Sequence, residues 1–143
     1  MAVIYVARSK TLSEWGAEVG ISKNLFKVGI GEGSGKDAGK EAVEALNEES
    51  FAGVTDWTLV KAADAGELAE EGAIATLAKR QPIVDPRYYP RLRGATGVFR
   101  VKPKDIENSM LVARAMSGEQ SLNFTLKPTD IADFLIKNAG GTP

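Results

Sequence analysis

Neither cysteine nor histidine occurs among the 143 residues of this sequence. The absence of cysteine excludes disulfides, thiol nucleophiles and thiolate metal sites. The absence of histidine removes the commonest general base and the commonest metal ligand. Acid–base chemistry therefore falls to Asp, Glu, Lys or Tyr, and any bound metal is expected to be a hard ion held by oxygen ligands.

Long apolar runs are also lacking. No stretch of about 18 apolar residues occurs, so we expect no membrane-spanning helix and no membrane partner. The amino terminus lacks the basic segment followed by an apolar segment that marks a secretory signal. We therefore expect a soluble, cytoplasmic protein, and the chain length predicts a single domain over residues 1–143.

Charge is unevenly distributed along the chain, although the formal net charge is only −1. Residues 32–71 carry eleven acidic side chains against three lysines, whereas residues 79–104 carry eight basic side chains against one aspartate. This pattern is typical of a surface that binds a polyanion, or of a solvated loop whose arginines pair with the acidic half, and the sequence leaves both open. The basic side chains that we take as candidate nucleic-acid contacts are Arg80, Arg87, Arg91, Arg93, Arg100 and Lys102.

The hydrophobic pattern predicts a mixed α/β (α+β) fold with a small central sheet flanked by helices. Strands are expected over residues 2–7, 25–30, 54–62 and 97–102. Helices are expected over residues 37–47, 64–80, 103–117 and 129–138, and residues 11–20 form either a short helix or a loop.

Two of the predicted helices carry more detailed expectations. In the helix over residues 64–80, Asp64 is the expected N-cap and Glu67 completes a capping box. In the helix over residues 103–117, the apolar spacing predicts four buried side chains, which are those of Ile106, Met110, Val112 and Ala113.

A glycine-rich segment over residues 29–37 lies between a predicted strand and a predicted helix, where a phosphate-binding loop would lie. Ile30 replaces the first glycine of that motif, and Asp37 replaces the hydroxyl that would bind magnesium. An acid at that position would repel phosphate. We therefore interpret the segment as a connection rather than a nucleotide site.

Two short apolar runs near the start each carry one polar or amphipathic side chain. The first run includes Tyr5 and the second includes Lys27. A tyrosine in a strand is usually part of the core, while lysine is depleted in strands and is rarely buried. A strand pair that brings a phenol beside an amine is therefore a candidate site as well as a core.

A group of glutamates lies on the helix predicted over residues 64–80. The usual interpretation of Glu67, Glu70 and Glu71 is a solvated helix surface. Glu71, however, precedes Ile74 by three residues and therefore flanks the apolar face. From that position its carboxylate could enter a groove and hold a divalent ion together with water and a phosphate.

Taken in order, these segments resemble the GIY-YIG nuclease superfamily, in the branch whose second motif is Lys-Ile-Gly. The first motif corresponds to Val3-Ile4-Tyr5 and the second to Lys27-Val28-Gly29. The helix glutamate of the family corresponds to Glu71, and its last strand corresponds to residues 97–101.

The resemblance covers residues 2–105 and leaves residues 106–143 as a C-terminal extension. It implies a metal-dependent endonuclease that hydrolyses phosphodiester bonds in DNA. Tyr5 and Lys27 would position or activate water, and Lys40 would hold phosphate. Glu71 would bind Mg²⁺ (or Mn²⁺), and the basic segment would follow the DNA backbone.

This chain departs from the family pattern on the helix that follows the second motif, because that helix contains no arginine. Lys36 or Lys40 is available there, Glu41 is an alternative occupant of the arginine's position, and Ala75 replaces a histidine often found after the glutamate. Two further hypotheses therefore stand beside the nuclease. One is a catalytically degenerate domain that binds nucleic acid or a protein partner without cleavage, and the other is an interaction protein whose acidic helices bind a basic partner.

Overall fold

The computed structural model describes residues 2–21, 24–84, 89, 92, 95–118 and 126–141. The strands are β1 (Ala2–Ser9), β2 (Leu25–Glu32), β3 (Trp57–Asp64) and β4 (Val98–Arg100). The helices are α1 (Lys10–Glu18), α2 (Gly35–Glu48), α3 (Glu70–Ala78), α4 (Pro103–Met116) and α5 (Pro128–Asn138), with a short 3₁₀ turn, η1 (Phe51–Gly53).

All four strands belong to one antiparallel sheet in the order β3-β1-β2-β4. The predicted α+β fold with a small central sheet is therefore confirmed. Most of the predicted strands and helices are present with slightly different bounds, and residues 11–20 contain the helix α1. None of the described helices has the length and apolar content that crossing a lipid bilayer requires.

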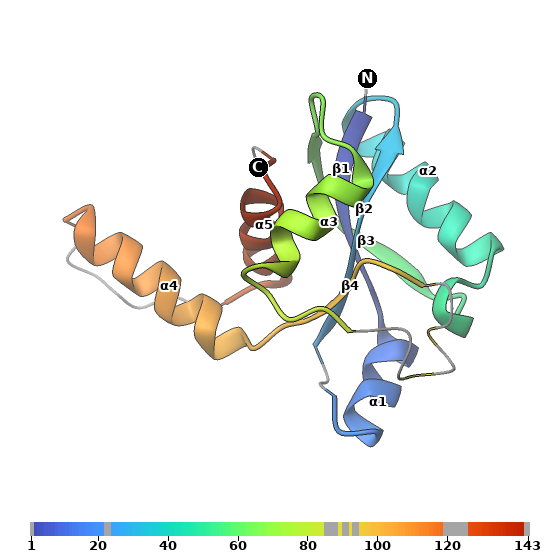
Figure 1. The fold of residues 1–143 in the computed structure, drawn as a ribbon, viewed down its shortest axis with the longest axis horizontal. Coiled ribbons are helices and arrows are strands. Elements are labelled where there is room, and N and C mark those ends of the chain that lie inside the picture. The colour runs from blue at the N-terminus through green and yellow to red at the C-terminus, as the bar shows by residue number, and fades with distance from the viewer. Residues whose placement is uncertain are drawn as a thin grey trace.

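The sheet has a core on each face, because successive side chains of a strand point to opposite sides. Ile4 and Phe26 pack with α3 and α5 on one face, whereas Tyr5 and Leu25 pack with α1 and α2 on the other. Figure 1 shows α2 on one side of the sheet and α3 with α5 on the other. Tyr5 and Lys27 therefore lie on the α2 side.

Helix α1 follows β1 without a connecting loop. The Ser9 hydroxyl accepts a hydrogen bond from the Leu12 amide at 3.1 Å, which caps the helix. The Asp56 carboxylate accepts hydrogen bonds from the Ser9 hydroxyl and from the Thr11 amide, the latter at 3.0 Å. A residue distant in sequence thus stabilises the start of this helix.

The predicted C-terminal extension contributes to the main core. Ile131, Leu135 and Ile136 of α5 are buried against the sheet, and Lys61 of β3 forms an ion pair with Asp133. Residues 106–143 are therefore packed in part against the same sheet that the resemblance covers.

The start of α3 was predicted incorrectly. Asp64 is the last residue of β3, and the helix N-cap is Ala69. The Ala65 amide donates to the Ala2 carbonyl at 2.9 Å, and Asp64 pairs with Val3, so the chain is still extended where the helix was expected to begin. The capping box proposed for Asp64 and Glu67 is consequently absent.

The burial predicted for α4 is also partly wrong. Ile106 is buried and Met110 is half-buried, but Val112 is 58% exposed and Ala113 is exposed. Figure 1 shows the reason, since α4 extends away from the sheet and reaches the rest of the molecule at its first turn and through α5.

A pair of core truncations tests this assignment of burial. Phe99→Ala is expected to lower the free energy of unfolding by about 3–5 kcal/mol, because Phe99 is fully buried. Val112→Ala, at a position predicted from sequence to be buried, is expected to change it by less than about 0.5 kcal/mol. Urea denaturation followed by circular dichroism measures both, and a large loss for Val112→Ala would contradict the exposed position of that residue.

Candidate functional site

A pocket of about 440 Å³ opens between α2 and the paired strands β1 and β2. Tyr5 reaches it from β1 and Lys27 from β2, and Glu70, the first residue of α3, borders it from the other side. The structure thus brings the two motif residues predicted from the sequence into one open site.

Gly29 creates the space that this arrangement needs. It lies opposite Tyr5 in the β1–β2 register. A Cβ atom at position 29 would lie 2.5 Å from the Tyr5 hydroxyl oxygen and 2.8 Å from Oε1 of Glu70. Both side chains therefore lie directly over the Gly29 backbone, where only glycine leaves room for them.

Lys27 is held firmly in place, with its side chain only 4% exposed. Its Nζ donates hydrogen bonds to the Val28 carbonyl at 3.1 Å and the Thr96 carbonyl at 3.0 Å. It also lies 3.7 Å from Oε1 of Glu70. Burial lowers the pKa of the Lys27 ammonium, and the negative charge of Glu70 opposes that shift.

Glu70 occupies the open edge of β2. Strand β4 pairs with β2 only as far as Lys27, and the Val28 amide donates to the Gly97 carbonyl just beyond that pair. The next outward-facing amide, that of Ile30, donates to Oε1 of Glu70 at 3.2 Å. The shortness of β4 therefore lets α3 place a carboxylate beside Lys27.

The Tyr5 side chain is 4% exposed, and its hydroxyl has no hydrogen-bond partner among the described residues. Burial raises the pKa of this phenol far above its usual value, and the negative charges of Glu70 and Glu49 raise it further. Tyr5 is therefore protonated at neutral pH and offers the pocket an uncharged hydroxyl.

Two other residues predicted for the site lie outside the pocket. Glu71 and Lys40 are exposed, and neither borders it. Because α3 begins at Glu70, that residue and not Glu71 lies beside β2. On α2, Gly39 packs against β3, and Glu41 lies on the side that faces the pocket.

The sequence contained a signal for each of these neighbours. Glu41 stands in the helix segment where the family arginine was sought, and Glu70 directly precedes the predicted metal ligand. Glu71 was preferred because it precedes Ile74 by three residues and matches the family glutamate. The structure places these side chains but does not test the roles that the resemblance implies for Tyr5, Lys27, Lys40 and Glu71, which stay predictions.

The pocket is strongly acidic. Among the described residues that line it, Glu32, Glu41, Glu49 and Glu70 stand against one cation, Lys27. Within the described ranges, no group of three or more Asp or Glu side chains is positioned to hold a metal ion. A cation in this pocket would accordingly be bound by scattered carboxylates rather than by a dedicated metal cage.

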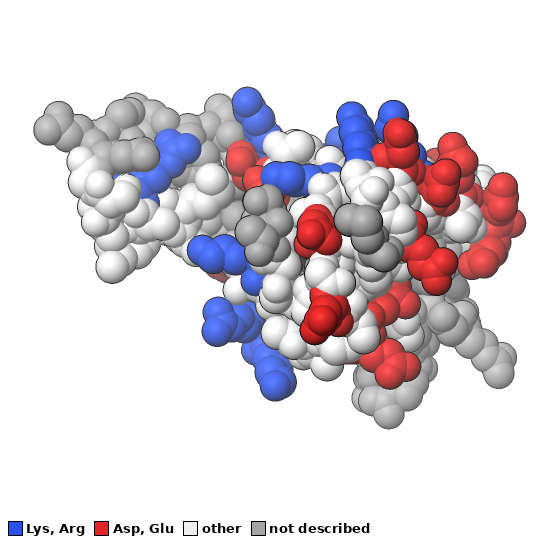
Figure 2. Space-filling view, turned by 90° about the horizontal axis from the view of Figure 1, so that it is seen from above, with Lys and Arg blue, Asp and Glu red and all other residues white. Residues whose placement is uncertain are grey.

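Three of the predicted nucleic-acid contacts are described, and all are exposed: Arg80, Arg100 and Lys102. None of the three borders the acidic pocket. In Figure 2 acidic side chains gather over the α2 side of the molecule, while most basic side chains lie towards α4. The other three contacts, Arg87, Arg91 and Arg93, lie outside the described residues.

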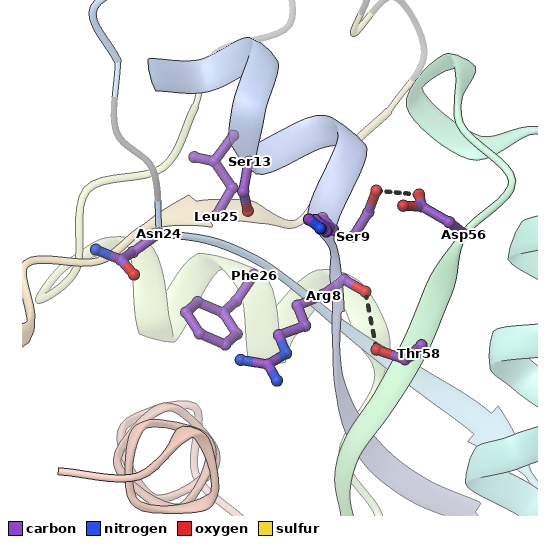
Figure 3. Close-up of a pocket in the computed structure, with 9 residues that line it drawn as sticks. Arg8, Ser9, Ser13, Asn24, Leu25, Phe26, Asp56 and Thr58 are labelled. Atoms are coloured by element: carbon purple, nitrogen blue, oxygen red, sulfur yellow. Dashed lines mark hydrogen bonds between the residues drawn. The ribbon is translucent and has the colours of Figure 1, made fainter. Parts of the chain in front are cut away.

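A second pocket of about 400 Å³ lies where β1 ends and β2 and β3 begin (Figure 3). The Asp56 carboxylate and the Ser9 hydroxyl there are bonded to each other and cap α1, and the Thr58 hydroxyl donates to the Arg8 carbonyl at 3.3 Å. Because these groups already hold the fold together, the pocket that contains Tyr5 is the stronger candidate.

Neither a protein-family model, nor a curated protein, nor a solved structure matches this chain. Support for a function therefore comes from the site geometry and from the motifs of the sequence.

The close approach at Gly29 yields a direct test. Gly29→Ala is expected to lower the free energy of unfolding by about 1–3 kcal/mol, because the new methyl group overlaps the Tyr5 hydroxyl and the Glu70 carboxylate. Gly72→Ala is the matched control, since Gly72 lies within α3 with no atom near its Cβ position, and it is expected to stabilise by about 0.4–1 kcal/mol. Denaturant titration of both variants measures the difference. Unchanged stability of Gly29→Ala would show that Tyr5 and Glu70 do not lie over Gly29.

Proposed function

We propose that this chain is a catalytically degenerate GIY-YIG-like domain that binds nucleic acid without cleaving it. The observation that carries the proposal is the charge of the pocket to which the resemblance assigns catalysis. On α2, where the family places a phosphate-binding arginine, the charged residue that borders the pocket is Glu41.

A phosphodiester would meet net repulsion in this pocket. The Lys27 ammonium already donates to two backbone carbonyls and lies beside Glu70, so it is not available to a phosphate. The other glutamates of the lining leave an excess of negative charge that an anionic substrate would have to enter.

The exposed basic residues support nucleic-acid binding at a different surface. We use the name basic surface for Lys79, Arg80, Arg100, Lys102 and Lys104, all of which are exposed. None of them forms an ion pair with a described acidic residue. Their charges are therefore free to neutralise phosphates and release counterions, which favours the polyanion interpretation of this segment.

This proposal predicts DNA binding that depends on salt and does not depend on metal. Fluorescence anisotropy with a labelled duplex is expected to show affinity that falls linearly with salt on a logarithmic plot and is unchanged by EDTA. Lys102→Glu is expected to weaken binding several-fold. Lys36→Glu, the same charge reversal at an exposed position on α2, is expected to leave it unchanged. Binding that is insensitive to salt, or equally weakened by both variants, would refute the proposal.

A second candidate function is the metal-dependent endonuclease itself, and the convergence of Tyr5, Lys27 and Glu70 favours it. Mg²⁺ is commonly held by one or two carboxylates together with water and substrate phosphate. The Glu70 side chain is 46% exposed at the pocket rim, so its carboxylate meets that requirement. A bound ion would supply positive charge opposite the phosphodiester. Tyr5 would donate a hydrogen bond there, while Lys27 would orient Glu70.

Cleavage assays separate the two functions. If the second candidate is right, Mg²⁺ or Mn²⁺ supports nicking of plasmid DNA, and Glu70→Gln lowers the rate by at least about 100-fold because the metal loses its carboxylate. Glu71→Gln, one residue further along α3 and outside the pocket, is the matched control with an unchanged rate. If Glu71→Gln lowered the rate and Glu70→Gln did not, the metal ligand would be Glu71. No cleavage with either ion would exclude the endonuclease.

A further inference from the structure

The acidic pocket is bordered by a polar group that no described residue bonds. Tyr5 is only 4% exposed, it borders the pocket, and its hydroxyl has no hydrogen-bond partner among the described residues. No described side-chain polar atom is both buried and without a partner, so the Tyr5 oxygen is accessible from the pocket, where a ligand can bond to it.

Carboxylates from two elements border the same pocket. Glu41 and the nearby Glu49 border the pocket on the α2 side, and Glu70 borders it from α3. All three are exposed, so they can turn towards a ligand without giving up a buried position. Burial raises the pKa of the Tyr5 phenol, and the negative charges of Glu70 and Glu49 raise it further. The same field attracts a cation.

The remaining lining is apolar. Ala38, Ala42 and Leu46 of α2 and Phe51 of η1 supply it, beside the backbone of Gly31. Such a surface accommodates the methylene stem of a long side chain while its charged end meets polar groups. The pocket therefore combines an apolar wall, a negative rim and an accessible hydroxyl that no described residue bonds.

We propose that this pocket binds an arginine side chain presented by a basic segment of a partner protein. The guanidinium is planar and carries five N–H donors in a fork, so it can reach carboxylates on both sides of the pocket and the Tyr5 oxygen together. A lysine ammonium is a compact, strongly hydrated charge that meets fewer of these acceptors at once. The inference goes beyond nucleic-acid binding, because it concerns the acidic pocket and not the basic surface.

Calorimetric titration of the full chain with two blocked peptides, acetyl-Arg-Arg-Arg-amide and acetyl-Lys-Lys-Lys-amide, tests this inference. The arginine peptide is expected to bind with one-to-one stoichiometry, to weaken as salt is raised, and to bind several-fold more tightly than the lysine peptide. Absence of binding at millimolar peptide would overturn the inference, and so would equal binding of the two peptides.

Three variants locate the binding site. Tyr5→Phe removes the hydroxyl alone and is expected to weaken arginine-peptide binding about fivefold, the value of one hydrogen bond. Glu41→Gln is expected to weaken it by at least as much. Glu44→Gln is the matched control, since Glu44 is exposed on the same helix but does not border the pocket. Equal losses for Glu41→Gln and Glu44→Gln would show attraction to the general charge of α2 and would overturn the assignment of the pocket. Circular dichroism confirms that each variant is folded.

Discussion

The antiparallel pairing of β1 with β2 is the constraint on which the candidate site depends. In this register Tyr5 lies opposite Gly29, so the phenol crosses a backbone that has no side chain. A slip of one residue would move Tyr5 out of register with Gly29 and turn side chains to the other face of the sheet. The core on each face of the sheet holds that register, because each core buries alternate residues of both strands.

A second constraint is the early end of β4. Its pairing with β2 stops at Lys27, which leaves the outer half of β2 without a neighbouring strand. There Oε1 of Glu70 accepts a hydrogen bond from the Ile30 amide. The same oxygen lies 3.7 Å from Nζ of Lys27. An edge amide that needs a partner thus explains why a carboxylate of α3 stands in the site, whether or not the site performs chemistry.

The charge pattern separates two charged surfaces that the sequence shows only as two segments. The acidic segment supplies most of the pocket rim, and the described basic side chains of residues 79–104 do not border it. In this arrangement a polyanion and a cationic group would not compete for one site. The motifs that resemble a nuclease and the electrostatics of the pocket therefore favour different ligands.

Much of this was accessible from the sequence. Apolar periodicity identified the strands and most helices, because burial on one face leaves a direct trace in residue order. It also marked Lys27 as an unusual strand residue and paired it with Tyr5. Tertiary structure alone decided that Glu70 and Glu41, rather than Glu71 and Lys40, border the pocket. That choice depends on where α3 begins and on how α2 is rotated against β3, and both are set by contacts between residues distant in sequence, such as Ala65 with Ala2 and Gly39 with Ala62.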